Sequence, residues 1–368
     1  MLSMKQKILY MLLGCGLIFS ACNDNEPDNG DKQDIILFST PAVAVESSSR
    51  AELVQSALPE GSVFSVYGYC IPLIDNQDAA SDDRFNPKGG ELEWNAKKDL
   101  LTPDVINGAD LKVDRLGSYY TGTPARWYTP NNPKVRKEAD PVDFKYSFIA
   151  FAPAGENFQI NHPAVGAPTL AYKVNYPCDE DAMYSFLTDH KREWGAVDLQ
   201  FHHILTALSV QFNNYNRDED IVVNNLQLEG SFYTQAAIDF SEPDPTVRVT
   251  DNALAQATMS FVNQPVTVAR EASAKAQDTF FVLANSHGTE SNYLGSSKVL
   301  TGSITYRGQT IDIRLPKEGS NFNFGRVPLP GVNYTLNINF IGNDIMLMLT
   351  ADDVEYWESG SDSNTIIE

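Results

Sequence analysis

The chain lacks the motifs that mark most enzymes and nucleic-acid-binding proteins. It has no Gly-x-Ser-x-Gly motif, no His-Glu-x-x-His motif and no glycine loop of the phosphate-binding type. Its 27 basic residues are outnumbered by 48 acidic ones, and a net charge of -21 disfavours contact with a phosphate backbone. We therefore predict no catalytic site, no cofactor and no nucleic-acid partner. A pair of carboxylates brought together by the fold, as in a glycoside hydrolase, is the enzymatic alternative.

Metal-ligating residues are scarce too. The chain has five histidines, and the adjacent pair His202 and His203 would point to opposite faces of a strand, which predicts a structural role. Asp78, Asp82 and Asp83 lack an EF-hand pattern, so we expect a solvated loop and no metal site. Cys70 and Cys178 either form a disulfide or stay separate thiols, because the sequence does not give their separation.

No apolar run is long enough for a transmembrane helix, but the N-terminus has a shorter one. Lys5 and Lys7 precede apolar residues 8–19, and Ser20 and Ala21 lead to Cys22. This layout resembles a secretion signal ending in a bacterial lipobox, with Phe19 in place of the usual aliphatic residue. It predicts a signal peptide over residues 1–21 and a lipid on Cys22, whereas the alternative is an ordinary signal with Cys22 unmodified.

Residues 22–34 are acidic and lack large apolar side chains, so they predict a flexible tether. After the tether no long stretch keeps a helical apolar period. Short β-branched and aromatic runs recur instead, at residues 63–69, 144–150, 334–340 and 345–349. Residues 304–306 and 311–315 flank Arg307, Gly308 and Gln309, which predicts a hairpin. Gly342 and Asn343, between residues 334–340 and 345–349, predict a second hairpin. We expect an all-β protein of antiparallel β-sandwiches with little helix, divided into residues 35–195 and 196–368.

Two features of the middle of the chain allow further expectations. Apolar residues alternate at odd positions over 197–201 and at even positions over 208–212, so we predict a bulge or a short helical turn around residues 202–206. Five aromatic residues in the loop-rich first half form either a sugar-binding platform or part of a core: Trp94, Tyr119, Tyr120, Trp127 and Tyr128.

Several segments, taken in order, resemble one family, the fimbrillin-like proteins of Bacteroidetes. They are IILFSTPAVAVESSSRAEL (residues 35–53), GSVFSVYGYC (61–70), YSFIAFAPAG (146–155), VDLQFHHILTALSVQF (197–212), IVVNNLQLEGSFYTQAAIDF (221–240) and DDVEYWESG (352–360). The nearest counterpart of the family's leucine-tyrosine motif is DAMY, at residues 181–184.

The resemblance implies two transthyretin-like sandwich domains in tandem and a lipoprotein exposed on the outer membrane. It also implies assembly with other fimbrial subunits by donor-strand exchange. In the family an arginine-directed protease removes the first strand, here residues 35–38, which makes Arg50 and Ala51 the candidate processing site. The donor strand would come from residues 352–367. Host or bacterial surface glycans or proteins are further partners, and the alternative function is a carbohydrate-binding surface lipoprotein outside any fimbria.

Overall fold

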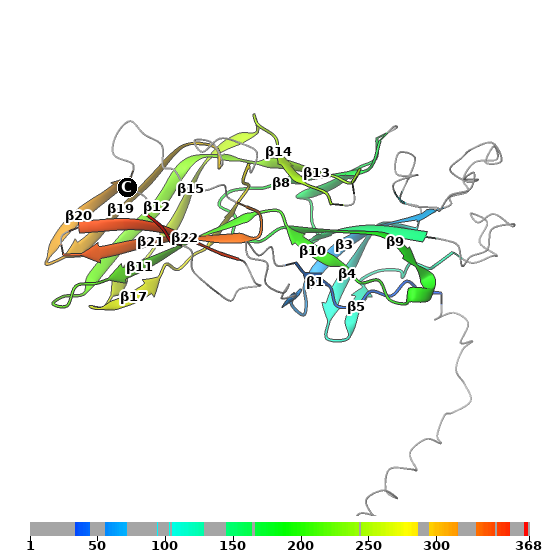
Figure 1. Ribbon diagram of the computed structural model, residues 1–368, viewed down its shortest axis with the longest axis horizontal. Helices are drawn as coiled ribbons and strands as arrows, with labels where there is room; N and C mark the ends of the chain where they lie inside the picture. Colours follow the sequence, from blue (N-terminus) through cyan, green and yellow to red (C-terminus); the bar gives the residue numbers. More distant parts are fainter. Residues whose placement is uncertain are drawn as a thin grey trace, which may run out of the picture. The chain divides into compact units, whose positions relative to one another are not determined.

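Figure 1 shows the computed structural model of the protein. The structure describes residues 34–44, 56–71, 94, 103, 105–128, 145–163, 166–242, 244–285, 294–315, 329–342, 344–353 and 364–366. Residues 36–368 form one compact unit and residues 1–35 another. In the larger unit most of the described residues form strands, which are joined by loops, turns and the 3-10 turn η3 (Arg192–Trp194). The all-β prediction is therefore confirmed. None of the described helical residues forms a helix long and apolar enough to cross a membrane.

Sheet A contains most of the N-terminal strands, in the order β2-β1-β10-β9-β6-β3-β4-β5. β1 runs parallel to β10, and the other neighbours are antiparallel. The strands are β1 (Ala42–Val43), β2 (Ser56–Ala57), β3 (Val63–Ile71), β4 (Ile106–Asp114), β5 (Gly117–Tyr120), β6 (Lys145–Ala152), β9 (Met183–Lys191) and β10 (Gln200–His203).

Sheet B covers one face of sheet A and has the order β14-β13-β8-β7. Its strands are β7 (Phe158–Asn161), β8 (Thr169–Lys173), β13 (Gln235–Asp239) and β14 (Val247–Val249). Ile149 and Phe151 of β6 pack in one cluster with Leu170 and Ile238 of sheet B, while Phe148 faces the other cluster of sheet A. Because β6 is central and covered on both faces, it is buried along nearly its whole length rather than on alternate residues only.

Sheets C and D form a sandwich in the C-terminal half, around a core that includes Phe212, Leu228, Phe261, Leu300 and Ile338. Sheet C has the order β17-β11-β21-β22-β23 with β18 also on β11, and sheet D has the order β15-β12-β19-β20 with β16 also on β12. Sheet C comprises β11 (Thr206–Asn214), β17 (Ala272–Lys275), β18 (Phe280–Val282), β21 (Val332–Ile341), β22 (Asp344–Asp353) and β23 (Asn364–Ile366). Sheet D comprises β12 (Ile221–Tyr233), β15 (Leu254–Val262), β16 (Val266–Val268), β19 (Ser296–Tyr306) and β20 (Gln309–Leu315).

Both predicted C-terminal hairpins are present. β19 and β20 are joined by Arg307 and Gly308, which have φ angles of 51° and 70°, as a type I′ turn requires. β21 and β22 pair from Ile341 with Asp344 outward, and Gly342 has a φ of 61° in their turn.

The predicted interruption near residues 202–206 is real, but its form differs. The chain ends β10 in sheet A at His203, crosses at Ile204 and Leu205, and begins β11 in sheet C at Thr206. The alternation changes phase because the two strands belong to different sheets, so neither the bulge nor the helical turn is correct. β10 still pairs with β9, across the expected boundary near residue 195, and the two-domain division stays a prediction.

Candidate functional site

The stretch of chain before the first long strand extends sheet A. We call residues 36–44, which include β1, the closing segment. It lies beside residues 197–201 and runs parallel to them. Three of its N–H groups donate to the carbonyls of every second residue in that stretch. These hydrogen bonds run from Ser39 to Val197, from Ala42 to Leu199 and from Ala44 to Phe201, at 3.1, 3.0 and 2.7 Å. The closing segment is therefore a bonded strand on the β10 side of the sheet.

The opposite edge of the closing segment meets β5. The Phe38 carbonyl accepts a hydrogen bond from the Ser118 N–H at 3.0 Å, and the Ile36 N–H donates to the Ala125 carbonyl at 3.0 Å. The Tyr120 hydroxyl donates to the Ile36 carbonyl at 3.1 Å, and burial raises the pKa of Tyr120, which keeps that hydroxyl protonated. β5 is the last strand at its end of sheet A. The first residues of the closing segment thus bridge β5 to the residues just before β10, and this contact closes that part of the sheet.

The side chains of the closing segment fill the core inside this closed sheet. Ile36 is 0%, Phe38 3% and Val43 0% exposed, whereas Leu37 is 58% exposed. The Phe38 ring packs edge-on against Tyr120 and Phe148, with centroid distances of 6.1 and 5.7 Å. Burial of an aliphatic or aromatic side chain stabilises by about 1.5–3 kcal/mol, so these three contribute roughly 5–8 kcal/mol before the cost of ordering the segment.

Gly117 allows the backbone of the closing segment to approach β5. Its φ is 145°, a conformation that favours glycine, and a Cβ built on it would lie 2.8 Å from the Phe38 carbonyl oxygen. Any other residue at position 117 would press against the backbone of the closing segment.

The predicted lipidation and processing residues, Cys22, Arg50 and Ala51, lie outside the described residues. The description stops at Ala44 and resumes at Ser56, where β2 pairs antiparallel with β1. A cut after Arg50 would therefore separate the closing segment covalently from β2 while leaving their hydrogen bonds in place. At the other terminus β23 pairs antiparallel with β22, and residues 354–363 of the expected donor segment are not described.

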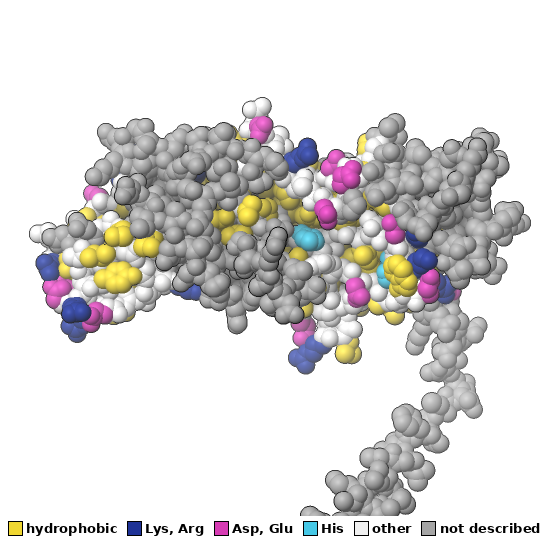
Figure 2. All heavy atoms as spheres, in the orientation of Figure 1, with side chains coloured by type: hydrophobic (Ala, Val, Ile, Leu, Met, Phe, Trp, Pro, Cys, Tyr) yellow, Lys and Arg dark blue, Asp and Glu magenta, His cyan; other side chains and the backbone are white. Residues whose placement is uncertain are grey.

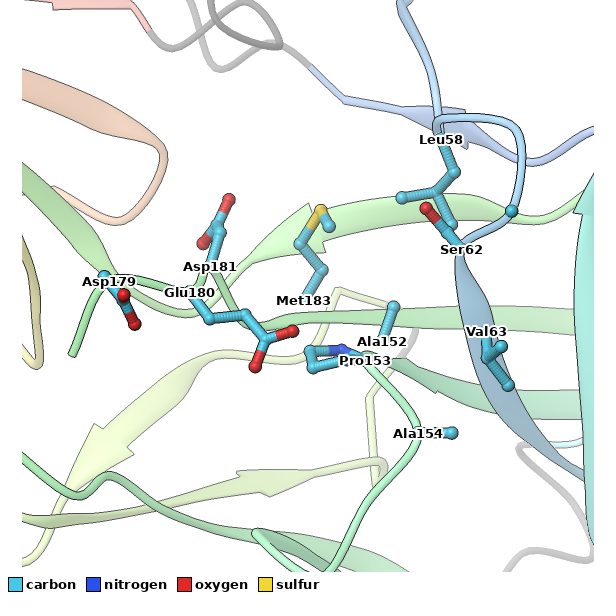
Figure 3. Close-up of a pocket in the computed structure, with 11 residues that line it drawn as sticks. Leu58, Ser62, Val63, Ala152, Pro153, Ala154, Asp179, Glu180, Asp181 and Met183 are labelled. Atoms are coloured by element: carbon cyan, nitrogen blue, oxygen red, sulfur yellow. The ribbon is translucent and has the colours of Figure 1, made fainter. Parts of the chain in front are cut away.

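A pocket of about 610 Å³ lies beside the start of β3 (Figure 3). Asp179, Glu180 and Asp181 supply its acidic side, and in Figure 3 their carboxylates spread apart rather than converge. Leu58 and Met183 supply apolar walls and belong to the same core cluster as the closing segment. Among the described residues, no group of three or more His, Cys, Asp or Glu side chains has the arrangement of a metal site.

The adjacent histidines have separate structural partners. The His203 ring is buried and its Nδ1 lies 2.5 Å from the carboxylate of Asp181, the first residue of the DAMY sequence. The His202 ring packs against Tyr184 at 5.6 Å between centroids, and burial lowers the pKa of His202. The two rings do not converge on one ion.

Cys70 and Cys178 are not joined by a disulfide. Cys70 belongs to the core cluster inside the closed sheet, whereas Cys178 packs at the border of the cluster between sheets A and B. The Cys178 thiol donates to the Glu180 carbonyl at 3.2 Å, and burial raises the pKa of that thiol. Of the two alternatives, the structure contains separate thiols.

The sugar-platform interpretation of the aromatic residues is wrong for the tryptophans. Trp94 is 1% exposed and its indole N–H donates to the Phe240 carbonyl at 2.9 Å. Trp127 is 5% exposed and packs on Tyr146 at 4.7 Å between centroids. Tyr128 is buried as well. Burial in the two core clusters leaves these rings no face for a sugar, so they act as core residues.

On the face shown in Figure 2, the described acidic and basic side chains lie among one another rather than in a single basic patch.

With this geometry in place, comparisons with known proteins identify the family. A model of the fimbrillin-like family matches residues 139–361. The chain belongs to the fimbrillin-like family. In fold this fimbrillin-like protein is similar to a fimbrial protein from Bacteroides vulgatus, with 15% identity over 82% of this chain and 92% of that chain, and a TM-score of 0.50. The fimbrial anchor protein Mfa2 from Porphyromonas gingivalis matches with 14% identity over 85% of this chain and 98% of that chain, and a TM-score of 0.32. No curated protein matches by sequence.

The sequence placed the first strand at residues 35–38, whereas β1 is Ala42–Val43 and Phe38 forms isolated bridges to Ser118 and Val197. It did not indicate the residues that hold this segment. Gly117, Ser118 and Tyr120 form one wall of the groove around the closing segment. The sequence indicates Tyr120 only as a platform or core aromatic residue. The GSYY sequence of β5 is short and has no distinctive pattern, so it does not indicate a strand partner about 80 residues away in the chain.

Proposed function

We propose that this fimbrillin-like protein is a structural or accessory subunit of a cell-surface fimbria and that it assembles by β-strand exchange. The observation that supports the proposal is the closing segment, a terminal strand hydrogen-bonded on both edges and buried in the core of sheet A. Family membership supports the fimbrial role. This role is non-enzymatic.

Loss of the closing segment would leave the Ser118 N–H, the Ala125 carbonyl and the facing backbone groups of residues 197–201 without their partners, and it would uncover the Phe148 ring. Unpaired strand edges of this kind bind an extended strand from another chain, and main-chain hydrogen bonds supply the affinity. A donor strand from a neighbouring subunit would restore both sets of bonds and refill the core. The intact segment, by contrast, keeps the groove occupied until assembly.

The proposal assigns roles to the N-terminal residues as well. Cys22 carries the lipid that delivers the precursor to the outer membrane, and the acidic tether over residues 22–34 holds the folded part away from the surface. Proteolysis after Arg50 leaves Ala51 as the new N-terminus. The incoming strand is provided by a C-terminal segment of another subunit, which in this chain corresponds to residues 352–367.

The test compares the wild-type chain with Arg50→Ala in the native cell. Protein sheared from the surface is analysed by intact mass and by electron microscopy, and Arg217→Ala is the control because Arg217 is an exposed arginine on the loop after β11. We expect wild-type and Arg217→Ala chains to begin at Ala51 and to form filaments. The Arg50→Ala chain should begin at acylated Cys22 and stay out of filaments. Filaments built from chains with an intact N-terminus would contradict the proposed processing.

A further inference from the structure

We propose that the groove of sheet A selects its incoming strand at one subsite, the space occupied by the Phe38 side chain. This inference rests on the strand exchange proposed above and names its ligand class. The ligand is an extended peptide segment of another subunit with an aliphatic residue, any residue and an aromatic residue in succession. It runs parallel to residues 197–201.

The subsite is built for an aromatic ring. Tyr120 from β5 and Phe148 from β6 present their rings to Phe38 in edge-on geometry, at centroid distances of 6.1 and 5.7 Å. Edge-to-face pairs of this kind add stabilisation beyond that of the buried area. Phe38 is 3% exposed, so its ring fills the space that these walls enclose.

The neighbouring positions explain the rest of the pattern. Ile36 points to the same side as Phe38, as residues two apart in a strand do, and it is fully buried. Leu37 points away and is 58% exposed, so the middle position accepts any side chain.

The backbone contacts fix the register of the strand. Phe38 forms bridges to Ser118 on one side and to Val197 on the other, and Gly117 admits the Phe38 carbonyl at close range. A slip by one residue would turn Ile36 and Phe38 outward and bring the other set of side chains into the core. An incoming strand must therefore place its aromatic residue at the position of Phe38, so that the carbonyl of that residue accepts the hydrogen bond from the Ser118 N–H of β5.

The experiment measures strand exchange in the full chain. A specific protease site replaces residues 47–52, so that cleavage does not depend on recognition of Arg50, and the cut protein retains its closing segment. The cut protein is then incubated with fluorescent peptides of residues 36–44, and capture is followed by anisotropy. The peptides are the native sequence, Phe38→Ala and the matched control Leu37→Ala.

We expect capture of the native peptide and of Leu37→Ala with affinities within about threefold of each other, since surface truncations cost little. Capture of Phe38→Ala should be weaker by about 100- to 5,000-fold, the loss typical of removing a buried phenylalanine side chain. Equal capture of the native and Phe38→Ala peptides would overturn the selective subsite while leaving strand exchange intact. Failure to capture the native peptide would overturn strand exchange itself, and the subsite with it.

Discussion

Gly117→Ala tests whether the close approach of β5 and the closing segment stabilises the fold. The added Cβ would lie 2.8 Å from the Phe38 carbonyl oxygen, at a residue whose φ of 145° disfavours alanine. Backbone strain at such a position costs about 1–3 kcal/mol. Displacement of the Phe38 carbonyl also weakens its bond from the Ser118 N–H, which adds about 0.5–1.5 kcal/mol. We expect the free energy of unfolding to fall by about 2–4 kcal/mol in total.

The matched control is Gly61→Ala. Gly61 also has a positive φ, of 95°, but an added Cβ would meet no atom within 4 Å, so this variant isolates the backbone strain. Urea unfolding of the two full-length variants gives the difference, which should be about 1 kcal/mol or more. Hydrogen exchange at the Ser118 and Val197 amides, which both donate to the closing segment, should accelerate in Gly117→Ala alone. Equal destabilisation by the two variants, with both amides still protected, would refute the reasoning.

Three other variants test separate parts of the structure. Tyr120→Phe removes the hydroxyl that donates to the Ile36 carbonyl but keeps the ring, so urea unfolding should show a loss of about 0.5–1.5 kcal/mol, and no loss would mean that the bond is not formed. Trp127→Ala should lower the free energy of unfolding by about 3–5 kcal/mol because the ring is buried. A glycan array should show no loss of binding specific to this variant. A variant that stays stable but loses glycan binding would restore the platform interpretation. Lys298 is 3% exposed, its ammonium donates to the Gly295 carbonyl, and burial lowers its pKa from the ordinary 10.5 to about 8. Between those two values the unfolded state binds more protons than the folded state, so stability contributed by this residue rises with pH across that window. Lys298→Met should therefore stabilise the protein by about 1–3 kcal/mol at pH 7, with the advantage shrinking toward pH 10, and an advantage that does not change with pH would count against the buried charge as its cause.

The hairpins were predictable because their signals are local. The Arg307–Gly308 turn needs two positive φ angles between alternating strands, and glycine within a short polar interval supplies that signal in the sequence. The strands themselves follow from β-branched and aromatic composition in the same way. Each of these features depends on residues within about ten positions of one another.

Features that depend on distant pairing were harder to predict. The phase change near His203 looked like a bulge because a single sequence cannot show that the chain moves from sheet A to sheet C. Likewise the composition of β6 predicts a strand but does not show that sheet B covers one of its faces. The aromatic residues at 94 and 127 had the composition of either a platform or a core, and only their distant partners, such as Phe240 and Tyr146, decide between the two.

The hydrogen bonds on both edges of the closing segment also determine what a proteolytic cut after that segment would change. A cut between Ala44 and Ser56 breaks no hydrogen bond of the segment and exposes none of its buried side chains, so the cut chain has no direct reason to release it. The cut removes the covalent linkage between the closing segment and the rest of the chain. That linkage gives the segment a high effective concentration at the groove, in the millimolar range for a short linker, which favours it over any other strand. After the cut, the resident segment and an incoming strand compete as two separate ligands for one groove. In the proposed exchange, a donor that fills the Phe38 position as well as the original, and that is itself linked to a neighbouring subunit, would then displace the segment. In the proposed mechanism, proteolysis would therefore make exchange thermodynamically possible, and the fit of the incoming strand would determine whether exchange occurs.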